Sequence, residues 1–179
     1  MNAATPKPDS KTRLLDAAMH LIRAQGYSAT TVDDICREAK LTKGAFFHYF
    51  ASKEDLAIAA AAHFAATAEG LFAAAPYRRL EDPLERVLGY IDFRTAMLEG
   101  PIPQFTCLLG TMVQEAYATH PAIREACDAY IGAHAAEIAK DIEAARQRHA
   151  PEATWSAESL ALYAQSVLQG AFVLAKAQN

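Results

Sequence analysis

The sequence predicts an all-α fold with about nine helices, and three observations lead to that prediction. Alanine is abundant and valine is scarce, which disfavours strands. Apolar residues recur with the three- and four-residue spacing of amphipathic helices, and no segment alternates strictly between apolar and polar residues. Because 52% of the 179 residues are hydrophobic, the chain can bury the core of one or two compact units.

The N-terminal residues divide into a polar arm and a first helix. Residues 1–9 contain two prolines and few apolar side chains, so we expect a mobile arm there. From Ser10 onward the apolar residues fall on one helical face, and Gly26 supplies a C-terminal stop. That face consists of Leu14, Ala18, Leu21 and Ile22.

The stretch TVDDICREAKLTKGAFFHYFASKEDL, which begins at Thr31, contains two short helix signals and the start of a longer helix. Thr31 and Asp34 have the spacing of a capping box. Thr42 can cap a second helix over residues 43–49, and Ser52 can cap a third. The two short helices are separated by about three or four residues, as in a helix-turn-helix that reads the DNA major groove.

The second short helix carries side chains suited to a polyanion. Gly44 has no side chain, so the backbone there could approach a sugar-phosphate edge closely. The helix N-terminus offers free N–H groups and a partial positive charge, and Phe47 could contact a thymine methyl group. Hydrogen bonds to phosphates or base edges are expected from Lys43, His48, Tyr49 and Lys53.

With the core T-K-G-x-F-F-x-Y-F-x-S-K-E-x-L, residues 10 to about 60 resemble the DNA-binding domain of the tetracycline-repressor (TetR) family. The resemblance implies a bacterial, cytoplasmic regulator that is not an enzyme: a homodimeric repressor of a palindromic operator in double-stranded DNA. Phe47 stands where a tyrosine is common, which puts a hydroxyl-mediated contact there in doubt. The resemblance assigns phosphate contacts to Thr31, Thr42, Tyr49 and Lys53, and groove contacts to Lys43, Gly44, Ala45, Phe47 and His48.

Charge supports a division of the chain into head and body. Residues 1–53 hold eight Lys and Arg against five Asp and Glu, a net charge of +3, whereas the remainder holds nine against sixteen, a net charge of −7. A basic head on an acidic body attracts a polyanion on one side only. We therefore expect the arm at 1–9, a DNA-binding domain at 10–56 with its helix-turn-helix at 31–50, and a regulatory and dimerisation domain at 57–179.

The body should contain several longer helices. The one that starts near Lys53 leaves the head and enters the body, so it is the natural lever between them. Asp82 caps the next helix, with Pro83 at its first position. A helix or helix pair follows the Gly100–Pro103 break. The expected segments are about 53–74, 83–98, 104–118 and 121–149, followed by a last helix capped by Ser156.

The resemblance also implies that the last two helices of each protomer form a four-helix dimer interface. Gly132 and Gly170 fall in the middle of these helices, where glycine costs about 0.5–1 kcal/mol relative to alanine. Close approach of a partner helix would offset that cost. The alternative is that these glycines serve packing within one chain.

A repressor needs a signal, and aromatic and methionine residues of the central helices could line a cavity for a small hydrophobic inducer. The alternative is that they form ordinary core. The candidate lining residues are Phe93, Met97, Phe105, Met112, Tyr117, Tyr130, Trp155, Tyr163 and Phe172.

Cys107 is a second candidate for sensing. It follows two prolines and lies near an expected helix N-terminus, where the helix dipole would raise its thiolate fraction. An oxidant or an electrophilic inducer could then modify it, and Lys176 could supply a positive charge or condense with the oxidised thiol. Some TetR-like regulators resemble this chain around residues 106–110 and sense reactive species. A buried, unreactive cysteine is the alternative.

The sequence contains no pattern typical of a metal site, a cofactor site or a membrane segment. The three cysteines are odd in number and the histidines lack H-x-x-x-H spacing, so we expect no metal. Glycine motifs for phosphates or dinucleotides are absent, so we expect no cofactor. Neither a signal peptide nor an uncharged apolar run of about eighteen residues supports a membrane location. Two alternatives remain: an all-α enzyme with Cys107 as nucleophile, or a helical adaptor without DNA binding.

Overall fold

The computed structural model describes residues 9–178. Over this range it contains nine α-helices, one short 3-10 helix and no strand, which confirms the all-α prediction. Apart from Asp9, the expected arm lies outside the described residues. The helices are α1 (Ser10–Gln25), α2 (Val32–Ala39), α3 (Lys43–Tyr49), α4 (Lys53–Ala73), η1 (Pro76–Arg79), α5 (Pro83–Ala96), α6 (Ile102–Phe105), α7 (Leu108–Ala116), α8 (Pro121–His149) and α9 (Ala157–Ala177).

Polar side chains start most of these helices where the sequence places them. At α2, Thr31 Oγ1 accepts a hydrogen bond from the Asp34 N–H while the Asp34 carboxylate accepts from the Thr31 N–H, which is the predicted capping box. Loss of such a cap costs about 1 kcal/mol. The other residues whose side chains cap a helix are Asp9 (α1), Thr42 (α3), Ser52 (α4), Asp82 (α5), Cys107 (α7) and Ser156 (α9).

Two residues with positive φ end the first two helices. Gly26 follows α1 at φ 90°, a conformation that favours glycine, and this confirms it as a helix stop. Lys40 ends α2 in the left-handed conformation at φ 53°. The resulting tight turn sets α3 across α1 and α2 as the second helix of the helix-turn-helix.

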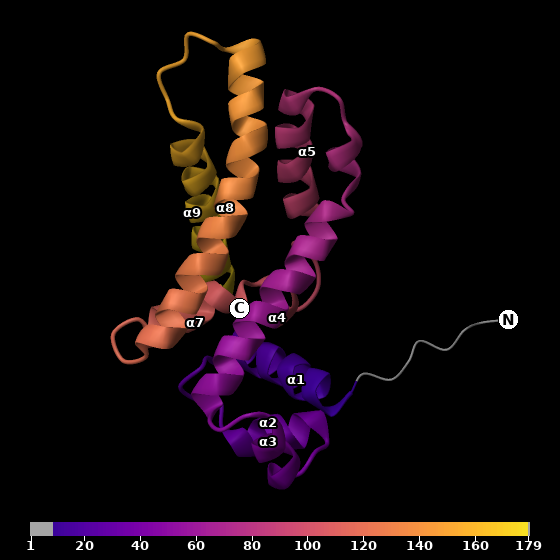
Figure 1. Cartoon of the computed structure of the whole chain (residues 1–179), viewed down its shortest axis with the longest axis vertical. Coiled ribbons are helices and arrows are strands. Elements are labelled where there is room, and N and C mark those ends of the chain that lie inside the picture. Colours follow the sequence, from indigo (N-terminus) through magenta and orange to yellow (C-terminus); the bar gives the residue numbers. More distant parts are fainter. Residues whose placement is uncertain (1–8, 179) are drawn as a thin grey trace, which may run out of the picture.

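Figure 1 shows α1, α2 and α3 together as a head at one end of the molecule, with α5, α8 and α9 extending away from it as a body. The α4 helix begins in the head and continues into the body, as the sequence predicted for the connecting helix. In the body, α8 packs against α4, α5, α7 and α9 and is therefore its central helix.

The hydrophobic core forms two clusters, and the first extends from the head into the body. It joins Leu14 of α1, Phe46 of α3 and Leu56 of α4 to Met112 of α7 and Ile123 of α8, all fully buried. The second cluster lies between α4, η1, α5, α8 and α9. Because close-packed interiors transmit strain, movements of α4 or α7 reach the head directly.

Three details differ from the sequence-based expectation. The segment from Pro76 forms η1, because proline fits the first position of a short helical turn. The α5 helix ends at Ala96, two residues before Leu98. The region expected as a helix or a helix pair is a pair, and its first member already begins at Ile102.

By length and composition alone, α4 and α9 are each long and apolar enough to cross a bilayer. The buried core helices of water-soluble proteins meet the same criteria. In α4, Leu56, Ala57 and Ala60 are buried in the first cluster. The apolar composition of α4 therefore has an explanation within the fold.

Candidate nucleic-acid interface and regulatory body

The α3 helix is fixed to the head by one ring and presents its other side to solvent. Phe46 is fully buried, and its ring centroid lies 5.8 Å from that of Phe50. Lys43, Gly44 and His48, predicted to face the DNA groove, are all exposed. Residues four apart lie on the same side of a helix, so Gly44 with His48, and Lys43 with Phe47, form neighbouring rows of one exposed surface.

Apolar and aromatic side chains complete that surface. Phe47 is 57% exposed, although its ring is large and apolar. Tyr49 is 40% exposed and its ring lies edge-on against His48, with centroids 4.7 Å apart. Ala45 is only half-buried. The predicted contact residues of α3 are thus all accessible to a ligand as large as duplex DNA.

Lys43 is paired within the head. Its Nζ lies 2.8 Å from Asp33 Oδ1 of α2, and this hydrogen bond raises the pKa of Lys43. Both side chains are more than half exposed, so the pair is worth little to stability. A phosphate group would therefore compete with Asp33 for this lysine.

The two threonines assigned to phosphates differ in their free donors. The Thr31 hydroxyl donates to Asp34 Oδ2 at 2.6 Å, and its N–H donates to the same carboxylate. Both donors of Thr31 are thus occupied. Thr42 Oγ1 only accepts, from the Ala45 N–H at 3.1 Å, so its hydroxyl proton is free to donate to a phosphate.

Lys53 is also engaged inside the head. Its Nζ donates to the carbonyls of Tyr27 and Thr30, at 3.0 Å each, and lies 4.3 Å from the centroid of the Tyr27 ring. Burial lowers the pKa of Lys53, while the charge of Glu115 acts in the opposite direction. Since an ammonium group has three N–H donors, one remains for a phosphate. The two hydrogen bonds of Lys53 hold the loop between α1 and α2 against α4.

A carboxylate of the body binds the same loop from the other side. Glu115 of α7 accepts hydrogen bonds from the backbone N–H groups of Tyr27, at 3.2 Å, and Ser28, at 2.8 Å. A Cβ atom on Gly26 would overlap Glu115 Oε1, so a side chain at this position would require Glu115 to move. No local sequence pattern marks Glu115, because its partners lie 88 and 87 residues earlier.

Two further contacts join α1 to the body. Arg23 donates to the carbonyl of Gln104 in α6 at 3.1 Å. Two turns earlier on α1, Asp16 lies 3.2 Å from His63 of α4. The head is therefore attached to the body through α4, α6 and α7, and not through the α4 lever alone.

The structure brings Cys107 and Lys176 into one neighbourhood. Cys107 is half-buried at the start of α7, and the Gly110 N–H points at its Sγ at 3.4 Å. Lys176 Nζ donates to Thr111 Oγ1 at 2.8 Å, and that hydroxyl donates to the Cys107 carbonyl at 3.0 Å. Burial lowers the pKa of Lys176. The expected placement of Cys107 near a helix N-terminus is confirmed, while its reactivity stays a prediction.

The other two cysteines are packed. Cys36 and Cys127 are buried in the first cluster, and burial raises the pKa of the Cys127 thiol to about 12. A nucleophilic thiol needs a base within hydrogen-bond reach. In the described chain, no hydrogen bond joins Cys107 Sγ to a histidine, so the alternative of a cysteine enzyme gains no support.

The nine candidate ligand-contacting residues do not all lie together. Phe105 and Phe172 pack together, with ring centroids 6.4 Å apart, and Phe93 packs on Phe72. Met112 is fully buried in the first cluster instead. Half-buried Met97 and Tyr130 border the second and first clusters, respectively. Three candidates lie at the surface and not in the interior, with these exposed fractions: Tyr117 (61%), Trp155 (42%) and Tyr163 (65%).

The interior of the body instead holds a polar chain that the sequence did not reveal. Gln165 Nε2 donates to the Tyr90 hydroxyl at 3.2 Å, and that hydroxyl lies 3.1 Å from His134 Nε2. The His134 ring also packs on Phe72, with centroids 4.7 Å apart. Burial, together with the charges of Arg94 and Arg78, lowers the pKa of His134 to about 4. His134 is therefore neutral at pH 7, and its Nε2 can accept a hydrogen bond from the Tyr90 hydroxyl.

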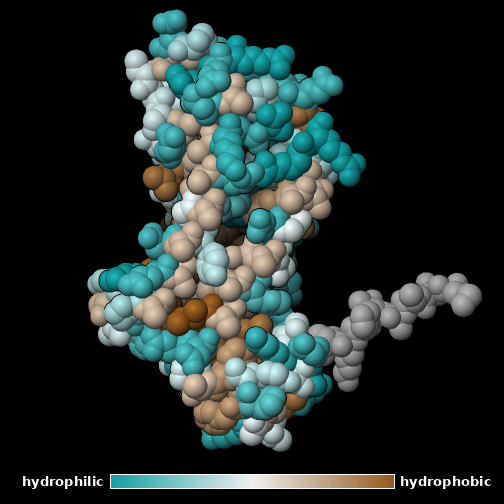
Figure 2. Space-filling view, viewed as in Figure 1, coloured by the Kyte–Doolittle hydropathy of each residue, from teal (hydrophilic) through white to brown (hydrophobic). Residues whose placement is uncertain are grey.

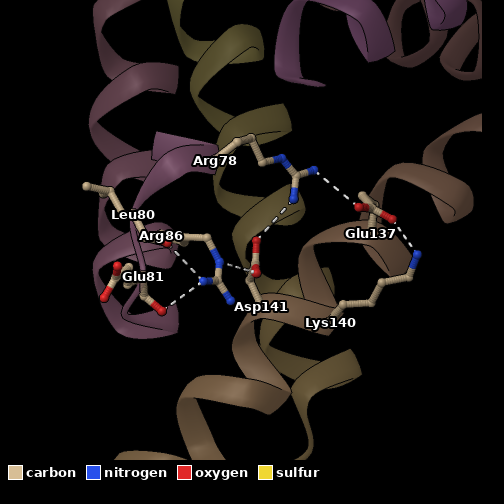
Figure 3. Close-up of polar contacts among 7 residues, drawn as sticks. All are labelled: Arg78, Leu80, Glu81, Arg86, Glu137, Lys140 and Asp141. Carbon is tan, nitrogen blue, oxygen red and sulfur yellow. Dashed lines mark hydrogen bonds and ion pairs between the residues drawn. The ribbon is translucent and has the colours of Figure 1, made fainter. Parts of the chain in front are cut away.

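An ion-pair cluster ties η1 and α5 to α8 (Figure 3). Asp141 accepts from Arg78 at 3.1 Å and from Arg86 at 2.7 Å, and Arg78 also reaches Glu137. Lys140 adds a pair with Glu137. Each charge has a partner of opposite sign, so the cluster is an internal brace and not an open binding site.

A surface pocket of about 370 Å³ lies between α7 and α8, and none of the predicted lining residues borders it. It is lined by Val113, Arg124, Glu125, Asp128 and Ile131.

Comparisons with known proteins agree with this architecture. Residues 14–60 match the model of the bacterial regulatory proteins of the tetR family, and residues 83–179 match that of the tetracyclin repressor-like C-terminal domain. An all-α molecule with a helix-turn-helix head and this C-terminal body defines a class of DNA-binding transcription regulators. The chain belongs to the TetR family of bacterial DNA-binding transcriptional regulators.

Curated relatives match part of the chain. YxaF of Bacillus subtilis, an uncharacterized HTH-type transcriptional regulator, is 33% identical over 88 residues, 49% of this chain and 46% of that protein. The HTH-type regulator TcmR of Streptomyces glaucescens is 35% identical over 81 residues, 45% of this chain and 34% of that protein. The chain thus spans less than half the length of the curated relatives it matches.

Solved structures match nearly the whole chain. A regulatory protein TetR from Rhodobacter sphaeroides superposes with a TM-score of 0.83 and 25% identity, covering 94% of this chain and 89% of that one. The reduced form of Escherichia coli NemR gives a TM-score of 0.78 at 23% identity, covering 95% and 88%. The latter likeness shows the fold alone.

Proposed function

We propose that two copies of this chain form a symmetric dimer that represses transcription, with each α3 in one half-site of a palindromic operator. The exposed α3 surface, Lys43, Gly44, Phe47 and His48 around the buried anchor Phe46, carries the DNA side of this proposal. Two-fold symmetry of the protein would match the symmetry of a palindromic site.

The dimer side rests on α9. Leu160, Tyr163, Val167 and Leu174 follow one another at spacings of three, four and seven residues, so they form a single stripe along the helix. Their exposed fractions run from 38% to 65%. A stripe of this length leaves a large apolar face uncovered, and a second copy of α8 and α9 is the partner we propose for it.

Two glycines support that partner. A Cβ atom on Gly132 of α8 or Gly170 of α9 would meet no atom of the described chain within 4 Å. Packing within one chain therefore does not require glycine at either position. Close approach of a partner helix gives a reason for both.

Induction would act through α7 as well as α4. The α7 helix begins at the Cys107 cap and ends near Glu115, which binds the head loop. Modification of Cys107, or binding of a small apolar or electrophilic molecule in the body, would shift α7 or α4 and change the spacing of the two α3 helices. Such a ligand must bind the two states with different affinity.

The dimer can be tested with a matched pair of variants on α9. Val167→Glu should give monomers in sedimentation equilibrium and weaken binding to the operator region by at least about tenfold, because a charge in an apolar interface is costly. Val173→Glu introduces the same charge outside the stripe and should remain dimeric. Val173 is 47% exposed and Val167 is 52% exposed, so the two sites are matched in exposure. A Val167→Glu protein that stays dimeric would refute this interface.

A further inference from the structure

Arg94 of α5 is a partly buried charged side chain of the body that has no charged partner among the described residues. Its guanidinium carbon lies 5.3 Å from the ring centroid of Phe72 in α4 and 6.0 Å from that of Phe172 in α9. Its Nε is buried and has no hydrogen-bond partner. Within residues 9–178, no ion pair or side-chain hydrogen bond joins Arg94 to a carboxylate.

The neighbouring arginines make the contrast clear. The other arginines of α5 and α8 each pair with a carboxylate; they are Arg86, Arg124, Arg146 and Arg148. Removing part of a guanidinium from water without a partner costs free energy unless another group neutralises the charge. Stacking on two rings recovers only part of that cost.

The groups around Arg94 supply no anion. Tyr90 and Phe93 flank it on α5. The carboxylates near the Tyr90–His134–Gln165 chain, Glu137 and Asp141, are already paired with Arg78, Arg86 and Lys140. Next to Phe105, whose ring packs on Phe172, Thr106 also leaves a fully buried hydroxyl unpaired. Unpaired polar atoms beside apolar rings are what a ligand with one polar end and an apolar frame would satisfy.

We infer that the inducer is a small apolar carboxylate, held by its anionic end on Arg94 and by its frame against Phe93, Phe105 and Phe172. This inference rests on the proposed function, since the ligand would be the signal that releases the operator. A planar guanidinium offers parallel N–H donors that match the two oxygens of a carboxylate.

The contact between Arg94 and Phe72 links such a ligand to α4. In the view of Figure 1 and Figure 2, the molecular surface is hollowed near the middle of the molecule, in the region where α4 and α8 diverge. Phe72 lies on α4, and the first part of α4 is packed in the core of the head. A ligand that inserts beside Arg94 would displace Phe72 and so move α4 relative to the head.

The test compares carboxylates with their neutral amides on the full-length chain. We would titrate benzoate, 2-naphthoate and octanoate, each against its carboxamide, by isothermal titration calorimetry. At least one carboxylate should bind about tenfold or more tightly than its amide, the size expected for hydrogen bonds to a charged group. Arg94→Gln should remove that preference and leave amide binding unchanged, whereas Arg79→Gln, an exposed arginine, should preserve it.

Stability of the ligand-free protein separates a binding role from a structural one. Arg94→Met should leave the melting temperature unchanged or raise it, because it removes an unpaired charge. Arg78→Met should lower it, because Arg78 holds two carboxylates.

Several results would overturn the inference. They are equal binding of carboxylate and amide, no binding of any carboxylate, a preference that survives in Arg94→Gln, or a loss of stability in Arg94→Met as large as in Arg78→Met. Operator binding without ligand is measured separately: if it persists while the carboxylate test fails, only this inference falls, and if it is absent, the proposed function falls.

Discussion

At the scale of single residues, His134 gives the body a pH dependence. Its pKa of about 4 in the folded chain lies below the ordinary value of 6.5, so the unfolded chain binds the proton more readily. Stability is therefore fully present above pH 6.5 and is lost as the pH falls toward 4. The carboxylates whose pKa values are lowered, such as Glu143 and Asp82, act only below their ordinary values of 4.5 and 3.8.

We predict that the free energy of unfolding falls by about 2 kcal/mol between pH 7 and pH 5 through His134 alone. His134→Asn should be less stable at pH 7 but should show a flatter pH dependence in urea denaturation. His48→Asn, on the exposed face of α3, should keep the wild-type slope. An unchanged slope in His134→Asn would show that another group titrates.

The ion pair between Lys43 and Asp33 leads to a prediction about DNA affinity. Asp33→Asn frees Lys43 for a phosphate and should tighten DNA binding about two- to fivefold at low salt, a gain that high salt should erase. Fluorescence anisotropy with a labelled duplex, at low and at high salt, measures the change in affinity. Glu38→Gln removes a charge from the same helix and serves as the control, since Glu38 has no ion pair in the described chain. Equal gains in both variants would argue against competition for Lys43.

At the scale of elements, α7 is a second connection between body and head. Its Glu115 holds the loop after α1 from one side, while Lys53 of α4 holds it from the other. A shift of either helix therefore acts on the same loop residues. The loop after α1 is thus held by α4 and α7 together.

Substitution at Gly26 tests this junction. Gly26→Ala should lower the free energy of unfolding by about 1–3 kcal/mol, because φ 90° is strained for alanine and its Cβ would collide with Glu115. Gly70→Ala, in α4 with no neighbour within 4 Å, should instead gain about 0.5–1 kcal/mol. Urea denaturation of both variants gives the comparison. Equal effects would mean that the loop tolerates a side chain.

Element by element, the sequence was most informative where structure is local. Thr31 with Asp34, Thr42, Ser52, Asp82 and Ser156 all cap the helices predicted for them, since a capping bond spans only two or three residues. The contacts that define the regulatory body span the chain instead. Gln165 reaches Tyr90 across 75 residues and Glu115 reaches Tyr27 across 88, and no spacing rule connects such pairs.

The same distinction explains the predicted ligand residues. Aromatic character marked Phe93, Phe105 and Phe172 as well as Tyr117 and Tyr163, but only the first three face the interior. Which side of a helix is covered depends on its neighbours, and for α9 part of the covering is proposed to come from a second chain. Arg94 was not predicted, because its missing partner is visible only in three dimensions.

At the scale of the whole molecule, the charge distribution and the apolar stripe act together. A head of net charge +3 in residues 1–53 on a body of net charge −7 orients the chain toward DNA by its head. Pairing two bodies through α9 would place two heads side by side and repeat the α3 surface once per half-site. Affinity for the operator should therefore depend on the dimer.

The most direct test is the binding of the full-length chain to the DNA that flanks its own gene, measured by anisotropy across a salt series. Our account predicts saturable binding of two chains to one inverted repeat, with an affinity that falls steeply as salt rises. Indifference to every such duplex at low ionic strength would contradict it, and so would tight binding of a single chain to one half-site.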